Sequence, residues 1–143
     1  MDPQVFIDIT IPQLHASTQA YKDKGWRFVN MCGATIDAGV ELIYSFSQGE
    51  ALENLRLNVG IDEEVPSISD IYFNSFVFEN ETHDLFGVGI KDIAIDFGGN
   101  FYTTSVPTPM NPASRAALDA AKSNTYGAAN YGACPVPTTT EEA

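Results

Sequence analysis

Apolar and polar positions along the first third of the chain predict a helix followed by strands. A helix is expected over residues 11–24, because Thr10 suits an N-cap position and Gly25 suits a helix end. Its buried face would be formed by Leu14, Thr18 and Tyr21, which share one side at helical spacing.

From Trp26 onward the apolar residues recur every second position, which is the period of a strand. Asp37-Ala38-Gly39 predicts a turn between this strand and the alternating residues 40–46, and residues 55–59 alternate again. A helix followed by such strands, with one apolar face to cover, predicts an α+β fold. We expect a two-layer sandwich in which an antiparallel meander of three to four strands packs with helices.

A second helix is predicted between Asn74, a suitable N-cap, and Gly87, a suitable C-terminal stop. The residues expected on its sheet-facing side are Phe78, Thr82, Leu85 and Phe86. A further short strand is expected before the turn signal Gly98-Gly99. Its alternating apolar residues would be Ile93, Ile95 and Phe97.

The composition of the chain changes near residue 103, after which proline, alanine, serine and threonine replace most large aliphatic residues. Residues 1–102 are therefore expected to form a compact α+β domain, and residues 103–143 a low-complexity C-terminal tail that is flexible alone and can order as an arm along a partner. One short helix can begin at Pro112, but Leu118 is its only large apolar residue, so it would not hold itself to a core.

Charge and chain length narrow the classes of function. The 143 residues fit one domain, and 19 acidic residues against 7 basic ones give a net charge of -12. That charge excludes binding to a nucleic acid backbone and opposes adhesion to anionic lipid. Neither a signal peptide pattern nor an apolar run of transmembrane length is present, so we expect a cytosolic or peripheral protein without a membrane span.

Two cysteines, Cys32 and Cys134, are too few and too far apart in sequence for a zinc or iron–sulfur site. Free thiols in a reducing compartment are the simplest interpretation.

The segment from Pro66 to Val88 is unusual because it places charged side chains between apolar residues. These side chains are Asp70, Glu79, Glu81, His83 and Asp84. Charged groups are seldom buried unless they are paired or bind a metal, so we expect a partner outside the segment to supply their counterparts. The pattern thus favours docking over chemistry.

The same segment also raises the question of a metal or catalytic site. On a helix, Glu79 and His83 lie close together and could chelate an ion with Asp84, but the second histidine, His15, belongs to the first helix. We therefore favour an ion pair over a metal site. Glu79 and Glu81 diverge on a helix, so they cannot serve one substrate as acid and base.

Two other patterns lack the context that chemistry needs. Ser67 and Ser69 are not in a nucleophile elbow, and we interpret them as turn-stabilising hydroxyls after Pro66. The pairs Gly87/Gly89 and Gly98/Gly99 lack the third glycine and the helix of a phosphate-binding loop. No catalytic residue is expected in this chain.

The run Val65-Pro-Ser-Ile-Ser-Asp-Ile-Tyr72, followed by Phe78-Glu-Asn-Glu-Thr-His-Asp-Leu-Phe-Gly-Val88, resembles the signature of the hydrophilic C-type subunit of respiratory NADH dehydrogenase (complex I). That signature has a Pro-Ser-hydrophobic-Ser/Thr stretch and then Glu-Arg-Glu-x-x-Asp-hydrophobic-Phe-Gly. Here Asn80 stands where the family usually has arginine, and a basic His-Pro-Asp-Leu-Arg-Arg segment does not follow the glycine. In these respects the chain is similar to the homologous small subunit of Ech-type energy-converting NiFe hydrogenases.

This resemblance implies a cofactor-free hydrophilic subunit of a membrane-bound hydrogenase, peripheral on the cytoplasmic face of the membrane and docked on the large nickel-bearing subunit. The implied complex passes electrons from reduced ferredoxin to protons and couples hydrogen release to ion translocation. The NiFe centre and iron–sulfur clusters would belong to the partners, which are large and small hydrogenase-like subunits, an iron–sulfur subunit and membrane subunits.

The signature residues would then be interface or fold-locking residues. They are Pro66, Ser67, Asp70, Glu79, Glu81, His83, Asp84, Phe86 and Gly87. The alternatives are the C-type subunit of an NADH:quinone oxidoreductase and, more distantly, a stand-alone metal-binding protein that uses Glu79 and His83.

Overall fold

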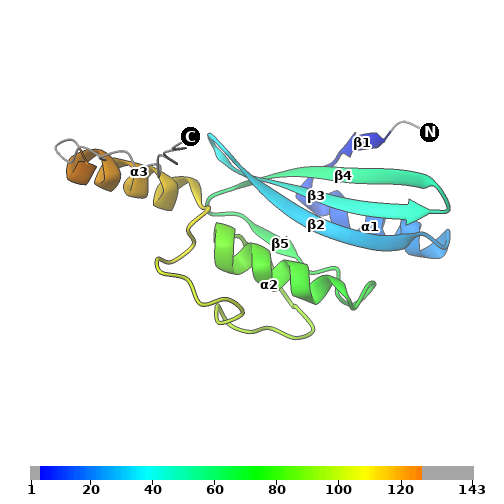
Figure 1. Ribbon diagram of the computed structural model, residues 1–143. Helices are drawn as coiled ribbons and strands as arrows, with labels where there is room; N and C mark the ends of the chain where they lie inside the picture. The colour runs from blue at the N-terminus through cyan, green and yellow to red at the C-terminus, as the bar shows by residue number, and fades with distance from the viewer. Residues whose placement is uncertain (1–3, 127–143) are drawn as a thin grey trace, which may run out of the picture.

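The computed structural model describes residues 4–126 (Figure 1). The elements occur in the order β1 (Val5–Asp8), α1 (Ile11–Asp23), β2 (Arg27–Ile36), β3 (Gly39–Gln48), β4 (Ala51–Gly60), β5 (Glu64–Pro66), α2 (Ser75–Phe86), β6 (Gly89–Lys91) and α3 (Pro112–Tyr126). Helices and strands pack together, which confirms the predicted α+β class.

The main sheet has the strand order β1-β4-β3-β2. Strands β2, β3 and β4 form the predicted antiparallel meander. The fourth strand, β1, was not predicted, and it pairs with β4 in parallel, so the sheet is mixed. Side chains reinforce this pairing, since Arg56 donates to Asp8 (Nε to Oδ1, 2.6 Å) and Asn54 donates to the Val5 carbonyl.

The short strands β5 and β6 form a separate parallel pair. The prediction of a strand over Ile93, Ile95 and Phe97 is wrong, because β6 ends at Lys91 and the chain is irregular beyond it. Its backbone is held by side chains of α2, as described below. The predicted turn at Gly98-Gly99 is present.

Both predicted helices are present with nearly the expected ends. In α1 the Gln13 side chain accepts the Thr10 N–H (2.9 Å), and the predicted buried face is confirmed: it consists of Leu14, Thr18 and Tyr21. Helix α2 ends at Gly87, whose φ of 72° lies in the left-handed region that glycine adopts readily.

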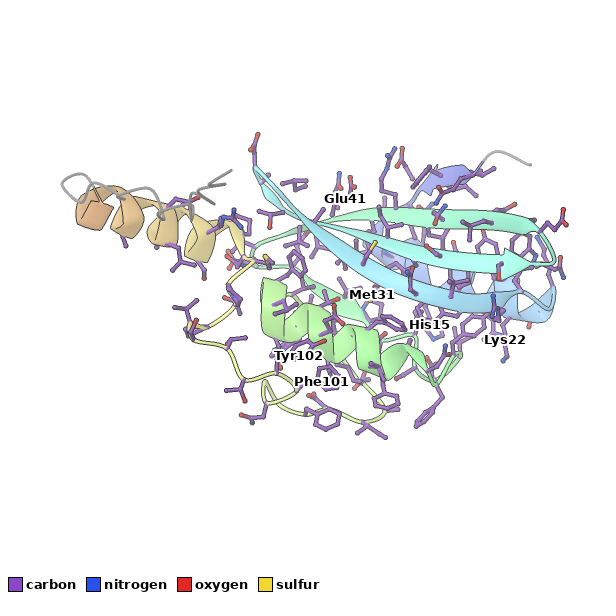
Figure 2. The ribbon with its side chains drawn as sticks, viewed as in Figure 1. His15, Lys22, Met31, Glu41, Phe101 and Tyr102 are labelled. Atoms are coloured by element: carbon purple, nitrogen blue, oxygen red, sulfur yellow. The ribbon has the colours of Figure 1, made fainter. Side chains whose placement is uncertain are left out.

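One face of the main sheet carries the core, and both α1 and α2 cover it. Tyr21 of α1 stacks on Phe46 of β3 with ring centroids 4.4 Å apart, and Phe78 of α2 meets Phe28 of β2 edge-on. Figure 2 shows Met31 between the sheet and α2, whereas Glu41 lies on the other face. The burial of these aromatic rings supplies much of the hydrophobic stabilisation of the fold.

The sheet-facing side of α2 contains Phe78, Thr82 and Phe86 as predicted, but it also contains polar residues that were not predicted there. Its buried residues include Ser75, Glu79 and Thr82, while Leu85 is only half-buried. Phe86 lies against Gly33 of β2, where a Cβ atom would be 2.9 Å from the ring. Polar groups therefore lie at the centre of this helix–sheet contact.

The segment after Tyr102 returns to the end of α2 before α3 begins. Met110 donates its N–H to the Leu85 carbonyl (2.7 Å), and its own carbonyl accepts the Thr35 hydroxyl of β2. Helix α3 then projects away from the sheet (Figure 1). The division into residues 1–102 and a flexible tail stays a prediction, and Cys134 lies outside the described residues. Within residues 4–126, no helix combines the length and the apolar character needed to cross a membrane.

Candidate functional site

Glu79 lies at the centre of the signature segment, fully buried on the sheet-facing side of α2. Its Oε2 accepts the Ser67 hydroxyl (2.6 Å), and its Oε1 accepts the Ile68 N–H (2.8 Å). The hydroxyls of Ser67 and Ser69 are 2.6 Å apart, and Ser69 accepts the Ala94 N–H. A single carboxyl group thus ties α2 to the segment that follows β5.

Burial raises the pKa of Glu79, while the hydrogen bonds from Ser67 and Ile68 act in the opposite direction. None of the ion pairs within residues 4–126 includes Glu79. The expectation that an outside partner satisfies this acid is therefore wrong, since donors of the same chain do so. The turn hydroxyls predicted at Ser67 and Ser69 are part of this network.

Two hydroxyls in the core of residues 4–126 lack a hydrogen-bond partner at close range. They are Tyr44 Oη and Ser75 Oγ, both fully buried. Burial and the nearby charge of Glu79 raise the pKa of Tyr44, so this phenol stays protonated at neutral pH.

Asn80 holds the opposite flank of α2 to the irregular segment after β6. It is almost fully buried, and its side-chain amide donates to the carbonyls of Phe76 (2.7 Å) and Ile95 (2.8 Å). Its Oδ1 accepts the Phe97 N–H (3.0 Å). From the sequence, Asn80 stood out only as a departure from the arginine of the family signature.

Asp84 and Glu81 bind the next part of the same segment. The carboxylate of Asp84 is buried and accepts the Tyr102 N–H (2.8 Å), and it also lies 3.1 Å from His83 Nδ1. Glu81 accepts the Tyr102 hydroxyl (3.3 Å). At the end of α2, Asn111 donates to the Phe86 carbonyl (2.8 Å). Both ends of the segment 102–111 are therefore bound to signature residues of α2.

Asp70 and Pro66 lie apart from these contacts. Asp70 is exposed and pairs with His15 of α1 (Oδ2 to Nε2, 2.8 Å), a surface ion pair of small energetic value. Pro66 belongs to β5 and pairs with Lys91 of β6. No sequence signal indicated that His15 would contact an acid of the signature segment.

The geometry does not favour the metal site considered at Glu79 and His83. Both Glu79 oxygens already accept hydrogen bonds, and His83 pairs with Asp84. In the part of the chain that the structure describes, no group of three or more histidine, cysteine or acidic residues is arranged to hold a metal ion. Cys32 is exposed and not in a disulfide.

Comparison with known proteins agrees with the signature. The family described as respiratory-chain NADH dehydrogenase, 30 kDa subunit, matches residues 7–94. Among solved structures, the fold is similar to a chain in the structure of the membrane-bound sulfane sulfur reductase, an archaeal respiratory membrane complex. That similarity has a TM-score of 0.71 at 13% identity and covers 92% of this chain and 82% of the other. No match was found among curated proteins.

Proposed function

Because the chain belongs to the family of the 30 kDa subunit of respiratory-chain NADH dehydrogenase, we propose that it is the corresponding hydrophilic subunit of a membrane-bound energy-converting NiFe hydrogenase. In this proposal it docks on the large subunit at the cytoplasmic face of the membrane and carries no cofactor or catalytic residue. The partner subunits hold the NiFe centre and the iron–sulfur clusters. They pass electrons from reduced ferredoxin to protons and couple this reaction to ion translocation.

The observation that carries the proposal is that buried residues of the family signature bind the chain's own backbone. Glu79, Asn80 and Asp84 each bind backbone groups of this same chain and are buried while doing so. Buried polar groups whose hydrogen bonds are satisfied within the chain rigidify the structure around them. The signature therefore supports a subunit that contributes a rigid surface to a larger assembly.

The hydrogenase branch is supported by the departures from the respiratory signature. Asn80 replaces the usual arginine, and its bonds to Ile95 and Phe97 hold a segment that differs from the basic run of the respiratory subunits. A buried arginine at this position would need an acidic partner, whereas the neutral amide needs only the backbone.

Two related complexes are the alternatives. An NADH:quinone oxidoreductase is favoured by the description of the matching family. A complex that reduces sulfane sulfur is favoured by the fold similarity to a chain of such an archaeal complex, although 13% identity supports the fold alone. All three place the chain in a respiratory membrane assembly.

The test is purification of the tagged full chain from gently solubilised membranes of its native host. The proposal predicts co-purification of a nickel-bearing large subunit with iron–sulfur and membrane subunits, and hydrogen evolution from reduced ferredoxin. Quinone reduction by NADH, or reduction of sulfane sulfur without hydrogen evolution, would assign the chain to an alternative complex. Recovery of the chain alone would contradict all three.

A further inference from the structure

Large apolar side chains gather on the flank of α2 that faces away from the sheet. This aromatic patch consists of Phe73, Phe76, Val77, Ile95, Phe97, Phe101 and Tyr102. Phe73 is 58% exposed, Phe97 42% and Tyr102 43%. Figure 2 shows Phe101 and Tyr102 on the side of α2 opposite the sheet. A group of exposed rings this large is uncommon on a free domain and marks an interaction surface.

The aromatic patch is preformed, because a buried side chain holds its two halves together. Phe73 packs on Phe76 (centroids 5.1 Å apart), and Phe97 packs on Phe101 (5.2 Å). Asn80 joins the two halves through its bonds to the carbonyls of Phe76 and Ile95. Aromatic rings held in place lose little conformational entropy when they bind, and such rings are typical of interface anchors.

The border of the aromatic patch is acidic. Glu81 binds the Tyr102 hydroxyl, and Asp96 lies in the sequence between Ile95 and Phe97. Lys91 is the only lysine or arginine between residues 57 and 114, and Glu64 pairs with it at 2.7 Å. The patch therefore combines an apolar centre with acidic side chains along its Ile95–Tyr102 edge, whereas Lys22 of α1 lies near its Phe73 end, 4.9 Å from the Tyr72 ring.

We propose that the aromatic patch is the surface by which this chain docks on a partner subunit, and that the partner presents an apolar surface bordered by lysine and arginine. The inference rests on the proposed function, which supplies the assembly. Charge complementarity identifies the occupant: a second copy would bring two acidic borders together, and an anionic membrane would repel the same acids. An apolar surface with a basic border on another protein would complement both the apolar centre and the acidic border of the patch.

The experiment compares tagged full-length variants purified from native membranes. Phe73→Ser combined with Phe97→Ser removes two exposed rings of the patch. Phe6→Ser is the matched control, because Phe6 is 47% exposed and lies in β1, outside the patch. Loss of two interface anchors should lower the recovery of partner subunits about tenfold or more, while Phe6→Ser leaves it unchanged. The thermal unfolding midpoint of each purified variant checks that exposed substitutions left the fold intact.

Two further measurements identify the occupant. A photoreactive phenylalanine analogue placed at Phe97 should crosslink to a partner segment that carries lysine or arginine beside apolar residues, and the same analogue at Phe6 should not. Glu81→Gln keeps the acceptor for Tyr102 but removes a border charge. This variant should lower partner recovery about twofold or more at low salt and less at high salt.

The outcomes separate this inference from the proposed function. If the wild-type chain copurifies with the complex and the patch variant does so equally well, the docking surface is elsewhere and only this inference fails. If the wild-type chain copurifies with no membrane complex, the proposed function itself fails. Crosslinks between copies of the chain, or flotation of the purified chain with lipid vesicles that the patch variant loses, would overturn the assignment of the occupant.

Discussion

Glu79 shows how a single polar residue can serve as the centre of a helix contact. It fills a position on α2 that faces the sheet, yet it binds a serine hydroxyl and a backbone N–H and no cation of the described residues. Such a network specifies one arrangement of the neighbouring segments, because any shift leaves a buried donor without an acceptor.

The raised pKa of Glu79 predicts a pH-dependent stability. The folded chain holds the proton more tightly than the unfolded chain, whose glutamate has its ordinary value of 4.5. The free energy of unfolding therefore decreases as pH rises from that value through the raised pKa, and this contribution is constant above it. Glu79→Gln should flatten this part of the curve, measured by urea unfolding at a series of pH values. An unchanged slope in the variant would contradict the assignment.

Glu79→Ala should behave differently from the glutamine variant. It leaves the buried Ile68 N–H without an acceptor, removes the acceptor of the Ser67 hydroxyl and opens a cavity, so we expect a loss of about 3 kcal/mol in the free energy of unfolding. Urea unfolding at neutral pH measures the difference. A loss as small as that of an exposed substitution would show that the network does not stabilise the fold.

Asn80→Ala removes the three bonds that hold Phe76, Ile95 and Phe97. We expect a loss of about 2 to 3 kcal/mol and faster hydrogen exchange at the Phe97 amide. Asn58→Ala is the control, because Asn58 is exposed on β4. Equal exchange at Phe97 in both variants would contradict the role of Asn80.

The sequence predicted that the acids of the signature are partly covered, which is confirmed for Glu79 and Asp84 but not for the exposed Asp70, and it did not predict what binds them. Glu79 meets Ser67 and Asp84 meets Tyr102 across 12 and 18 positions of the chain. Contacts between residues this far apart in the sequence depend on how the segments pack. Neither the spacing of the residues nor their charge predicts such contacts. The prediction that groups outside the segment pair with its acids followed from the rarity of unpaired buried charges. It is wrong for Glu79, whose donors lie inside the segment, whereas Asp84 binds Tyr102 outside it.

Among the elements, those with strong periodicity were predicted well and short segments were not. The helices and the meander follow from their periods and from their glycine ends. Strand β1 has only four residues, and its partner β4 lies far along the chain. The alternation of Ile93, Ile95 and Phe97 resembles a strand, but its backbone groups bind the side chain of Asn80 and not another strand.

Substitution of Gly87 tests how tightly the end of α2 packs against the segment that returns beside it. A Cβ at Gly87 would lie 3.0 Å from Thr108 Cγ2 and 3.2 Å from Asn111 Nδ2. Gly98 has a similar positive φ but no atom within 4 Å of that position, so Gly98→Ala measures backbone strain alone. We expect about 1 kcal/mol of destabilisation for Gly98→Ala and about 2 to 3 kcal/mol for Gly87→Ala by urea unfolding. Equal destabilisation by the two substitutions would show that the returning segment moves away from the added Cβ at little cost.

In the molecule as a whole, residues 103–111 and α3 have different relations to the rest of the chain. Met110 and Asn111 bind the end of α2, whereas α3 projects away from the sheet. A chain ending after residue 111 should keep the unfolding midpoint of the full chain, and one ending after Tyr102 should unfold several degrees lower. Thermal unfolding of the two truncated chains checks this, and equal midpoints would contradict a stabilising role for residues 103–111.

The fold class and the family could be predicted from the sequence, because the periods and the signature are local patterns. The assembly cannot be read in the same way, since it depends on surfaces that meet only in the complex. We propose that this chain is a structural subunit without which a hydrogen-evolving membrane complex does not assemble.

Hydrogen evolution from reduced ferredoxin, measured on membranes of a host strain that lacks this chain, tests that proposal. We expect that the activity is lost and that the wild-type chain restores it. A chain with Glu81→Gln and His83→Gln should also restore it when expressed in excess, because the proposal gives these side chains no role in the chemistry. Full activity in membranes without the chain would contradict the proposed role.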